Sequence, residues 1–566
     1  MKMRKAPSLA IVMALLSGGV AVLPRHQNRS AAERASSRPA EMLRQVADEV
    51  WQRRLGSPAL RLEQGLPVVE LPRLSPAMAE EEATFARSTL AKLETINEAD
   101  LSHEDALTLA LLRWDASQEA EAAKFHWLTS PLTPYNSTLA RTVHPLFTSF
   151  GFGQAADLDR YLDLLADYTR LIEEMHNHLR RQAARGIVLP KDEIDLVMAL
   201  LKGFAQEPGK SLFMVDDVRL RGIEAQPASR FKQQLATEIR ARTNPALVAL
   251  MAYLAGPYRE QAPDQVGLWQ YPGGTDYYQY LVKHHTTMEI TPEEVHQVGL
   301  KEVERLEREM AEVREKLGFR GAKAEFHKFL KTDTRFFPKT PDEIRAKLLK
   351  HANDINSKLD RLFLTRPRAP FDTQRLAPSL EGVMTFGYYQ RPTPNNPTGV
   401  YYFNGSKLEE RSLLQSESLI YHELVPGHHF HIASQSENDR LPPVRKNYYS
   451  TAFTEGWGMY ASTLGRELGQ YRDLYDLYGY LSMQIMVATR LVVDTGMNHL
   501  RWPRARAMEF MREHTLLSET EIDTESLRYS VDLPGQALAY KMGEIKLHEL
   551  RERAQKNLGD KFDARI

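Results

Sequence analysis

The chain of 566 residues contains no cysteine. This absence excludes disulfide bonds, thiolate metal ligands, a cysteine nucleophile and lipid attachment through a cysteine. Any metal must therefore be held by histidine and carboxylate side chains. A strong net charge is also missing, because 73 Lys and Arg offset 74 Asp and Glu to a formal net charge of −1. No global field favours nucleic acid or an anionic membrane, and we expect neither as a partner.

Long apolar runs are scarce, and the one that carries information lies at the N-terminus, from Leu9 to Leu23. Basic residues precede this run and a Ser-Gly-Gly triplet interrupts it, which is typical of a secretory signal. The run is short and broken for a transmembrane helix. We predict that residues 1–25 are a signal peptide or an N-terminal anchor, without other stable membrane insertion, and that the protein is periplasmic or secreted.

The remaining composition, with 42% hydrophobic and 26% charged residues, is that of a globular protein. Apolar residues recur at i, i+3, i+4 and i+7 in many segments, for example residues 41–51 and 158–182, which predicts helices. Residues 382–389 and 399–404 are short, β-branched and aromatic, which predicts strands. We expect an N-terminal helical lobe over residues 26–256 and a catalytic lobe over residues 257–566.

The densest group of chemically usable side chains reads Tyr-His-Glu-Leu-Val-Pro-Gly-His-His-Phe-His and ends at His431. The zinc-binding pattern H-E-x-x-H places two histidines at i and i+4 of one helix. Here the residue at i+4 from His422 is Pro426, which lacks an N–H group and interrupts a helix. We predict a helix over residues 408–425 that bulges at Pro426 and Gly427.

Such a bulge absorbs two extra residues and brings His428 into the role of the second ligand, beside His422. His429 is the alternative second ligand, although in a straight helix it lies about 10 Å from His422 along the axis. Glu455, in Thr-Glu-Gly-Trp-Gly-Met-Tyr, is the predicted third ligand, because the small residues around it permit close helix approach. The set fits one zinc ion with a position left open for water. His431 is expected to support or pack against the ligands.

Glu423, adjacent to the first histidine ligand, is the predicted general base, which takes a proton from zinc-activated water and passes it to the leaving amine. A peptidase also needs donors that stabilise the oxyanion of the tetrahedral intermediate. The candidate donors are His499, Tyr529 and Tyr540.

A substrate carboxylate would be bound by an arginine in a bidentate contact. Arg528, next to Tyr529, is the favoured residue for this role, and Lys541 is a weaker alternative. Arg490 is also a candidate, although Asp494 at i+4 makes an intrahelical ion pair its first explanation.

The strand predicted at residues 399–404 immediately precedes the metal-binding helix. Zinc peptidases commonly use such a strand edge to pair with the extended backbone of a substrate. Tyr401 and Tyr402 are therefore predicted to flank the bound peptide.

The two motifs His-Glu-Leu-Val-Pro-Gly-His-His and Thr-Glu-Gly-Trp-Gly-Met-Tyr resemble the bacterial family labelled domain of unknown function 885, a set of zinc-peptidase-like proteins. The likeness runs from about Glu41 to the end, where a further short C-terminal segment is expected. Other segments that resemble the family are residues 267–299, 397–404, 490–496, 528–529 and 534–541. The family is similar in outline to the mostly helical thimet oligopeptidase and carboxypeptidase Taq groups. The resemblance implies a zinc site and peptide hydrolysis.

We therefore predict a mainly α, two-lobed, zincin-like metallopeptidase with a small β element beside the active-site helix. It would cleave short peptides as a carboxypeptidase or oligopeptidase. The alternatives are a zinc amidohydrolase that acts on a non-peptide amide, and a catalytically inactive exported binding protein.

Overall fold

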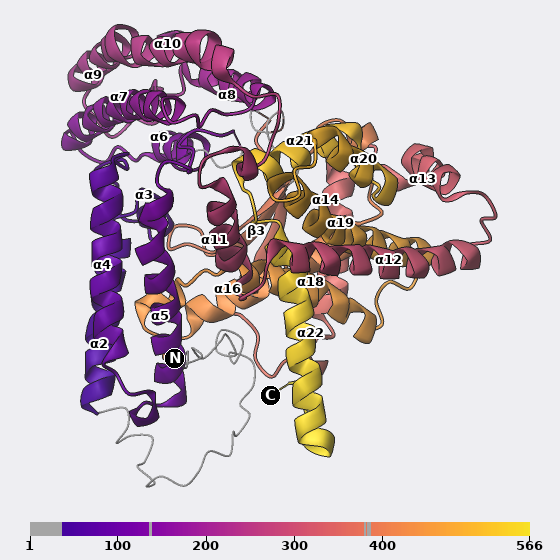
Figure 1. The fold of residues 1–566 in the computed structure, drawn as a ribbon. Coiled ribbons are helices and arrows are strands. Elements are labelled where there is room, and N and C mark those ends of the chain that lie inside the picture. Colours follow the sequence, from indigo (N-terminus) through magenta and orange to yellow (C-terminus); the bar gives the residue numbers. More distant parts are fainter. Residues whose placement is uncertain (1–36, 135–137, 379–380, 382–386, 566) are drawn as a thin grey trace.

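The computed structural model describes residues 37–134, 138–378, 381 and 387–565. The predicted N-terminal signal and most of the strand predicted at 382–389 lie outside the described residues. Helices dominate the described part, which confirms the mainly α prediction (Figure 1). None of the described helices is long and apolar enough to span a membrane.

The described part of the chain begins with α2 (Arg38–Arg54), α3 (Pro58–Glu63), α4 (Pro76–Glu94) and α5 (His103–Ala122), of which α2, α4 and α5 pack against one another. The side chains of Ser37, Ser75 and Ser102 cap α2, α4 and α5 by accepting hydrogen bonds from backbone N–H groups of the first turn. The apolar faces of these three helices share a core with Val444, which comes from the distant short helix α17 (Pro443–Lys446).

A second group of helices forms the layer at the top of Figure 1: α6 (His144–Ser149), α7 (Ala156–Ala183), α8 (Lys191–Phe204), α9 (Ala225–Glu238) and α10 (Asn244–Tyr253). The amphipathic pattern expected at residues 158–182 is helix α7, within two residues at each end. These helices share one hydrophobic core that extends in sequence from Val68 to Ala262. The division of the chain into two lobes at residue 256 stays a prediction.

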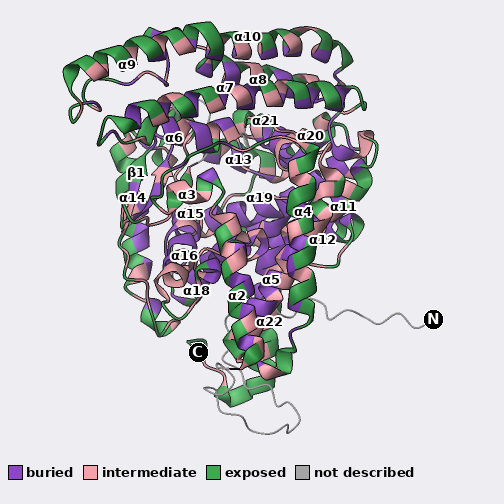
Figure 2. Cartoon of the chain, turned by 90° about the vertical axis from the view of Figure 1, so that its left-hand side faces the viewer, coloured by how far each residue is buried: buried purple, intermediate pink, exposed green. Residues whose placement is uncertain are grey.

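The chain then forms α11 (Gly274–Thr286), α12 (Pro292–Lys316), α13 (Lys323–Thr332) and α14 (Pro341–Asn356). A capping box starts α12, in which Thr291 and Glu294 satisfy each other's backbone N–H groups. Helix α12 packs along α19 (Leu474–Asn498), and Figure 2 shows how deeply α19 is buried. Every residue of α19 from Tyr478 to Asn498 is buried, so this helix forms the centre of the C-terminal core.

The small sheet consists of β1 (Phe371–Arg375), β2 (Tyr388–Gln390) and β3 (Gly399–Phe403) in the order β1-β3-β2. Strand β1 runs parallel to β3, and β2 runs antiparallel to it. The sequence predicted β3 but not β1. As a result β3 is the central strand, which changes the role expected for it.

The remaining longer helices are α15 (Ser416–Glu423), α16 (His428–Glu437), α18 (Thr451–Glu467), α20 (Arg504–His514), α21 (Glu519–Leu527) and α22 (Leu538–Leu558). Helices α18 and α22 approach closely where Gly456 faces Gly543. A Cβ atom on Gly456 would lie 2.6 Å from the Cα of Gly543, and a Cβ on Gly543 would lie 2.2 Å from the carbonyl oxygen of Ala452. The glycines are needed for this crossing.

Candidate metal centre

The predicted metal-binding helix is interrupted at Pro426. Helix α15 ends at Glu423 and α16 begins at His428, and the peptide bond between Val425 and Pro426 is cis. The indole N–H of Trp457 donates to the Pro426 carbonyl oxygen at 2.8 Å, which ties the interruption to α18. The expected break is therefore present, and two short helices meet at the motif.

The helix predicted over residues 408–425 is shorter than expected. Residues 408–410 form a single 3₁₀ turn, and α15 starts only at Ser416. The backbone N–H of Leu413 donates to the carbonyl oxygen of Phe336 at 2.7 Å instead of an acceptor within a helix. This tertiary contact, which the local pattern does not reveal, keeps the intervening residues out of a helix.

Gly427 is required by a close approach within the break. A Cβ atom at this position would lie 1.8 Å from the carbonyl oxygen of His422 and 2.4 Å from that of Tyr421. No side chain can be accommodated there, so the chain can reverse onto the end of α15 only with glycine. This geometry brings His428 back beside His422.

The two histidines converge on Glu455 of α18. The Nε2 atoms of His422 and His428 each lie 3.4 Å from Oε2 of Glu455. Ligand atoms of the three residues all lie within 4.8 Å of one another. The side chains are 4%, 10% and 12% exposed, respectively, so the group is nearly buried.

These separations fit a tetrahedral zinc site. With bonds of about 2.0–2.2 Å, two ligands of a tetrahedral zinc ion are separated by about 3.3–3.5 Å. Oε2 of Glu455, the atom on which both histidines converge, is buried and has no hydrogen-bond partner among the described residues. Buried polar atoms without partners are rare, and an ion or a water is their usual explanation. The three residues therefore fit the donor set of a catalytic zinc site, with the fourth position left for water.

The charges of the cluster are strongly coupled. Burial, together with the adjacent His428, lowers the pKa of His422 to about 4. Burial opposes the charged form of His428 as well, but Glu455 outweighs this and raises its pKa. Burial likewise opposes ionisation of Glu455, yet the two imidazoles hold the pKa of this carboxyl well below its usual range. The cluster therefore favours an ionised Glu455 beside His422 in its neutral form, the state needed for metal coordination.

Glu423 is the last residue of α15 and adjoins the cluster. Burial raises the pKa of its carboxyl to about 7, with Glu455 adding to the shift and His428 opposing it. A carboxyl group with such a pKa can both accept and release a proton near neutral pH.

The alternative ligand His429 faces away from the cluster. Its Nδ1 lies 3.1 Å from the Tyr389 hydroxyl and its Nε2 lies 3.0 Å from the carbonyl oxygen of Ala369. Both ring nitrogens are thus engaged with the sheet and the segment before it, and His428 is the histidine that joins the cluster. His431 lies with its ring 5.9 Å from that of His428 and edge-on to Phe453 at 5.5 Å, in a packing position.

Helix α18 shapes the site at a second residue, one turn after Glu455. A Cβ atom at Gly458 would lie 2.6–2.8 Å from three atoms of the His422 ring. Glycine at this position therefore leaves the space that the imidazole occupies. The small residues expected to permit close helix approach serve here to admit a ligand ring.

Tyr540, a predicted oxyanion donor, does lie beside the cluster. Its ring stacks on that of His422, with centroids 6.0 Å apart and planes at 13°. The guanidinium of Arg490 lies 4.7 Å from the centroid of the Tyr540 ring. Arg528 donates to the Tyr540 hydroxyl at 3.4 Å. Two of the predicted substrate-binding arginines thus position a tyrosine at the cluster.

Those two arginines are themselves held by Glu525, which sequence reasoning did not identify. Arg490 donates to Oε2 of Glu525 at 3.1 Å, and Arg528 donates to Oε1 at 3.2 Å. The hydroxyl of Tyr529 also donates to this carboxylate and accepts from Arg490 at 2.7 Å. Tyr529 is 1% exposed, so the structure makes it part of a buried network, in place of the oxyanion donor that we expected.

The intrahelical pair expected between Arg490 and Asp494 is wrong. Asp494 instead accepts hydrogen bonds from the Tyr278 hydroxyl at 2.6 Å and the backbone N–H of Gly535 at 3.0 Å. The i, i+4 spacing places both residues on one face of α19, but Arg490 pairs with Glu525, and Asp494 accepts from Tyr278 and Gly535.

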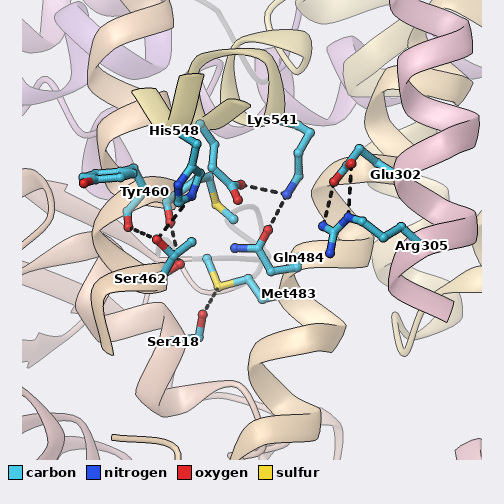
Figure 3. Close-up of polar contacts among 12 residues, drawn as sticks. Glu302, Arg305, Ser418, Tyr460, Ser462, Met483, Gln484, Lys541 and His548 are labelled. Carbon is cyan, nitrogen blue, oxygen red and sulfur yellow. Dashed lines mark hydrogen bonds and ion pairs between the residues drawn. The ribbon is translucent and has the colours of Figure 1, made fainter. Parts of the chain in front are cut away.

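His499, predicted as an oxyanion donor, and Lys541, the alternative carboxylate-binding residue, both contact other protein residues instead. His499 caps the C-terminal end of α19 and pairs with Glu293 at the start of α12, near the surface. Lys541 is fully buried, and Figure 3 shows it pointing toward Gln484. Its ammonium group also donates to Glu544 at 2.7 Å. These partners account for both residues without a substrate.

The role predicted for β3 as a substrate-pairing edge is wrong, because β1 and β2 occupy its two sides. Tyr401 is 3% exposed and lies between Thr373 of β1 and Tyr389 of β2. Tyr402 stacks on Tyr388, with ring centroids 5.3 Å apart. Both tyrosines are therefore engaged in contacts within the sheet.

The fold and site together define a mainly helical protein in which an interrupted helix carries two histidines beside a glutamate of a neighbouring helix. The chain belongs to the family described as bacterial protein of unknown function (DUF885), whose profile matches residues 58–566. The resemblance seen in the two motifs is thus confirmed at the level of the family.

Two solved structures share the fold. The structure described as the putative lipoprotein from Colwellia psychrerythraea aligns with a TM-score of 0.82 and 24% identity, over 93% of this chain and 94% of that chain. A second, described as a putative lipoprotein of unknown function from Shewanella oneidensis, aligns with a TM-score of 0.68 and 18% identity, over 94% of this chain and 96% of that chain. No curated protein matches the chain.

Proposed function

We propose that this protein hydrolyses peptide bonds in short peptides with the help of one zinc ion. The observation that carries the proposal is the convergence of His422, His428 and Glu455 at separations suited to tetrahedral coordination, with Glu423 next to them. Two histidines and a glutamate, with a fourth position for water, form a ligand set of zinc peptidases.

A bound zinc ion would polarise a carbonyl group and lower the pKa of a water molecule. Glu423 accepts a proton from the attacking water at a carboxylate oxygen and returns it to the leaving amine. Tyr540 donates from its hydroxyl to the oxygen of the former carbonyl group, where negative charge develops. Arg490 and Arg528 hold the ring and hydroxyl of Tyr540 in place.

An exported location supports a role in degrading peptides outside the cytoplasm. The two solved neighbours are described as putative lipoproteins, and the N-terminal sequence of this chain reads as a secretory signal. Because the chain contains no cysteine, lipid attachment through cysteine is excluded for it. We therefore expect a periplasmic or secreted peptidase.

The substitution Glu423→Gln tests the proposal. The variant should bind one zinc ion per chain, as wild type does, and lose cleavage of a peptide library followed by mass spectrometry. Glu417→Gln is the matched control, since Glu417 lies on the same helix and accepts a hydrogen bond from Tyr421 at 2.7 Å that glutamine can retain. Retained turnover in Glu423→Gln contradicts the assigned role, and wild type without stoichiometric zinc contradicts the proposal as a whole.

A further inference from the structure

Glu525 is a buried carboxylate that lies outside the metal cluster. It belongs to the last turn of α21, and 1% of its surface is exposed. Its oxygens accept hydrogen bonds from Arg490 at 3.1 Å and from Arg528 at 3.2 and 3.3 Å. Arg490 comes from α19, and Arg528 comes from the π-helical turn Arg528–Asp532. The carboxylate therefore joins two cationic side chains from different segments.

The charge of Glu525 is kept by its partners. Burial opposes ionisation of Glu525, but Arg528 and Arg490 outweigh it and hold the pKa of this carboxyl below its usual value. The Tyr529 hydroxyl also donates to the carboxylate. Because desolvation of the charges offsets much of their attraction, a buried ion pair often adds little net stability. A role in positioning therefore explains this network better than stability alone.

Each arginine held by Glu525 also contacts Tyr540, at a different part of the side chain. The guanidinium carbon of Arg490 lies 4.7 Å from the ring centroid, a cation–π contact. Arg528 uses Nη1 for Glu525 and donates from Nη2 to the Tyr540 hydroxyl at 3.4 Å. Because the guanidinium is planar and rigid, this contact fixes the hydroxyl relative to the carboxylate.

The position of Tyr540 matters because its ring stacks on that of His422, with centroids 6.0 Å apart. A donor to the oxyanion of a peptide substrate must lie about 3 Å from the oxygen that gains negative charge. A misplacement of about 1 Å can cost about 100-fold in rate. The restraints on the ring and the hydroxyl of Tyr540 are therefore of a kind that turnover depends on.

We infer that Glu525 is a positioning residue, which holds Arg490 and Arg528 so that the Tyr540 hydroxyl lies where negative charge develops during peptide hydrolysis. The inference rests on the proposed peptidase function and on the role of Tyr540 within it. Glu525 is buried and contacts neither the substrate nor the metal cluster. Its charge should therefore affect kcat and leave substrate binding and zinc binding unchanged.

The substitution Glu525→Gln tests the inference, because glutamine keeps the size of the side chain and removes its charge. In the zinc-loaded variant, kcat for a short peptide should fall roughly 10- to 100-fold. KM and the zinc affinity measured by competition with a chelator should stay unchanged. Glu525→Asp keeps the charge and withdraws the carboxylate by one methylene group. It should also lower kcat at constant KM, and it provides the test if Glu525→Gln does not fold.

The effect of Glu525 should disappear when Tyr540 lacks its hydroxyl. Tyr540→Phe should lower kcat about 10²- to 10³-fold, the loss typical of one oxyanion donor. Adding Glu525→Gln to this variant should lower kcat no further, because residues that act as one unit are not additive. Losses that multiply in the double variant overturn the inference.

Two results in the single variant also overturn the inference. One is a wild-type kcat in folded Glu525→Gln. The other is a KM that falls at constant kcat, which would show that Glu525 competes with the substrate for Arg490 and Arg528.

Glu544→Gln is the matched control, because Glu544 is a buried carboxylate that also pairs with a cation. It is 6% exposed, lies on the same helix as Tyr540 and accepts from Lys541 at 2.7 Å. The control should lose stability and keep the wild-type kcat. An equal loss of kcat in both variants overturns the inference, since it assigns the effect to the loss of any buried ion pair.

Failure of the proposed function is distinguishable from failure of this inference. If zinc-loaded wild type cleaves no peptide, the proposed function fails, and crystal structures of wild type and Glu525→Gln decide the inference. A Tyr540 ring displaced from His422 in the variant supports it, and a ring in its wild-type position overturns it. If wild type cleaves peptides and Tyr540→Phe keeps the same kcat, the proposed hydrolysis stands and the inference is overturned.

Discussion

The substitution Gly458→Ala should displace His422, a proposed zinc ligand, without changing any of the proposed ligand residues. The new Cβ atom would lie 2.6 Å from Cε1, 2.7 Å from Nδ1 and 2.8 Å from Nε2 of His422. Unstrained contacts between such atoms are about 3.5–4.0 Å, so the ring must retreat by about 1 Å. Zinc–nitrogen bonds of about 2.0–2.1 Å tolerate deviations of only about 0.2 Å. We expect zinc affinity to fall by roughly 10- to 100-fold or more, the effect typical of disturbed ligand orientation.

Competition with a chromophoric zinc chelator measures this affinity directly. Gly465→Ala is the matched control, because a Cβ atom there would lie 2.7 Å from the ring of Tyr471, on the same helix but away from the metal centre. Both variants should lose thermal stability, and only Gly458→Ala should lose zinc affinity. Zinc binding of wild-type strength in Gly458→Ala would refute the placement of His422 as a ligand.

Two further predictions concern buried charges. Burial and the neighbouring Asp532 raise the pKa of Glu193, which is 0% exposed, well above its usual range. The folded state thus holds this proton more tightly than the unfolded chain does, and the associated stability is lost as pH rises above about 4.5, the value of an unperturbed Glu. Glu193→Gln should therefore increase the free energy of unfolding at pH 8 more than at pH 5, by about 1.4 kcal/mol for each unit of the pKa shift. Calorimetry at the two pH values should accordingly show a larger rise in melting temperature at pH 8. Lys541→Met should cost about 3–5 kcal/mol in urea unfolding, because it leaves the carboxylate of Glu544 buried and unpaired.

Each of these predictions has a contrary result. A Glu193→Gln protein that gains no stability at pH 8 would show that Glu193 and Asp532 are not forced together by folding. For Lys541→Met, adding Glu544→Gln should recover part of the loss. A double variant as unstable as the single one would show that the loss arises from packing.

The sequence predicted those helices and strands whose formation depends on a local residue pattern. The amphipathic repeat of α7 lies where expected, because it depends on local periodicity. Strand β1 was missed, since residues 371–375 read Phe-Asp-Thr-Gln-Arg and become a strand only by pairing with β3. That pairing joins segments about 28 residues apart, as for Phe371 and Gly399, and local propensity does not encode it.

The pair of histidines at the centre of the site was predictable because both lie in one short stretch of sequence, where their spacing limits which side chains can meet. Proline at i+4 from His422 requires a break, which favoured His428 but left His429 as an alternative. The contacts of His429 with Tyr389 and Ala369 separate it from the cluster. The surrounding roles were not predictable in the same way. Arginine and tyrosine suit both catalysis and packing, and only the three-dimensional arrangement shows that Glu525 holds Arg490 and Arg528 while Tyr540 reaches His422.

The crossing of α18 and α22 helps to position the candidate metal centre, although α22 contributes none of its three residues. Helix α22 supplies no ligand, yet Gly543 lies against the Ala452 carbonyl on the first turn of the helix that carries Glu455 and makes room for His422. A methyl group at residue 543 would push against α18 and so displace both Glu455 and the space that accommodates His422. The position of Glu455 and the space for His422 therefore depend on a glycine that lies on another helix.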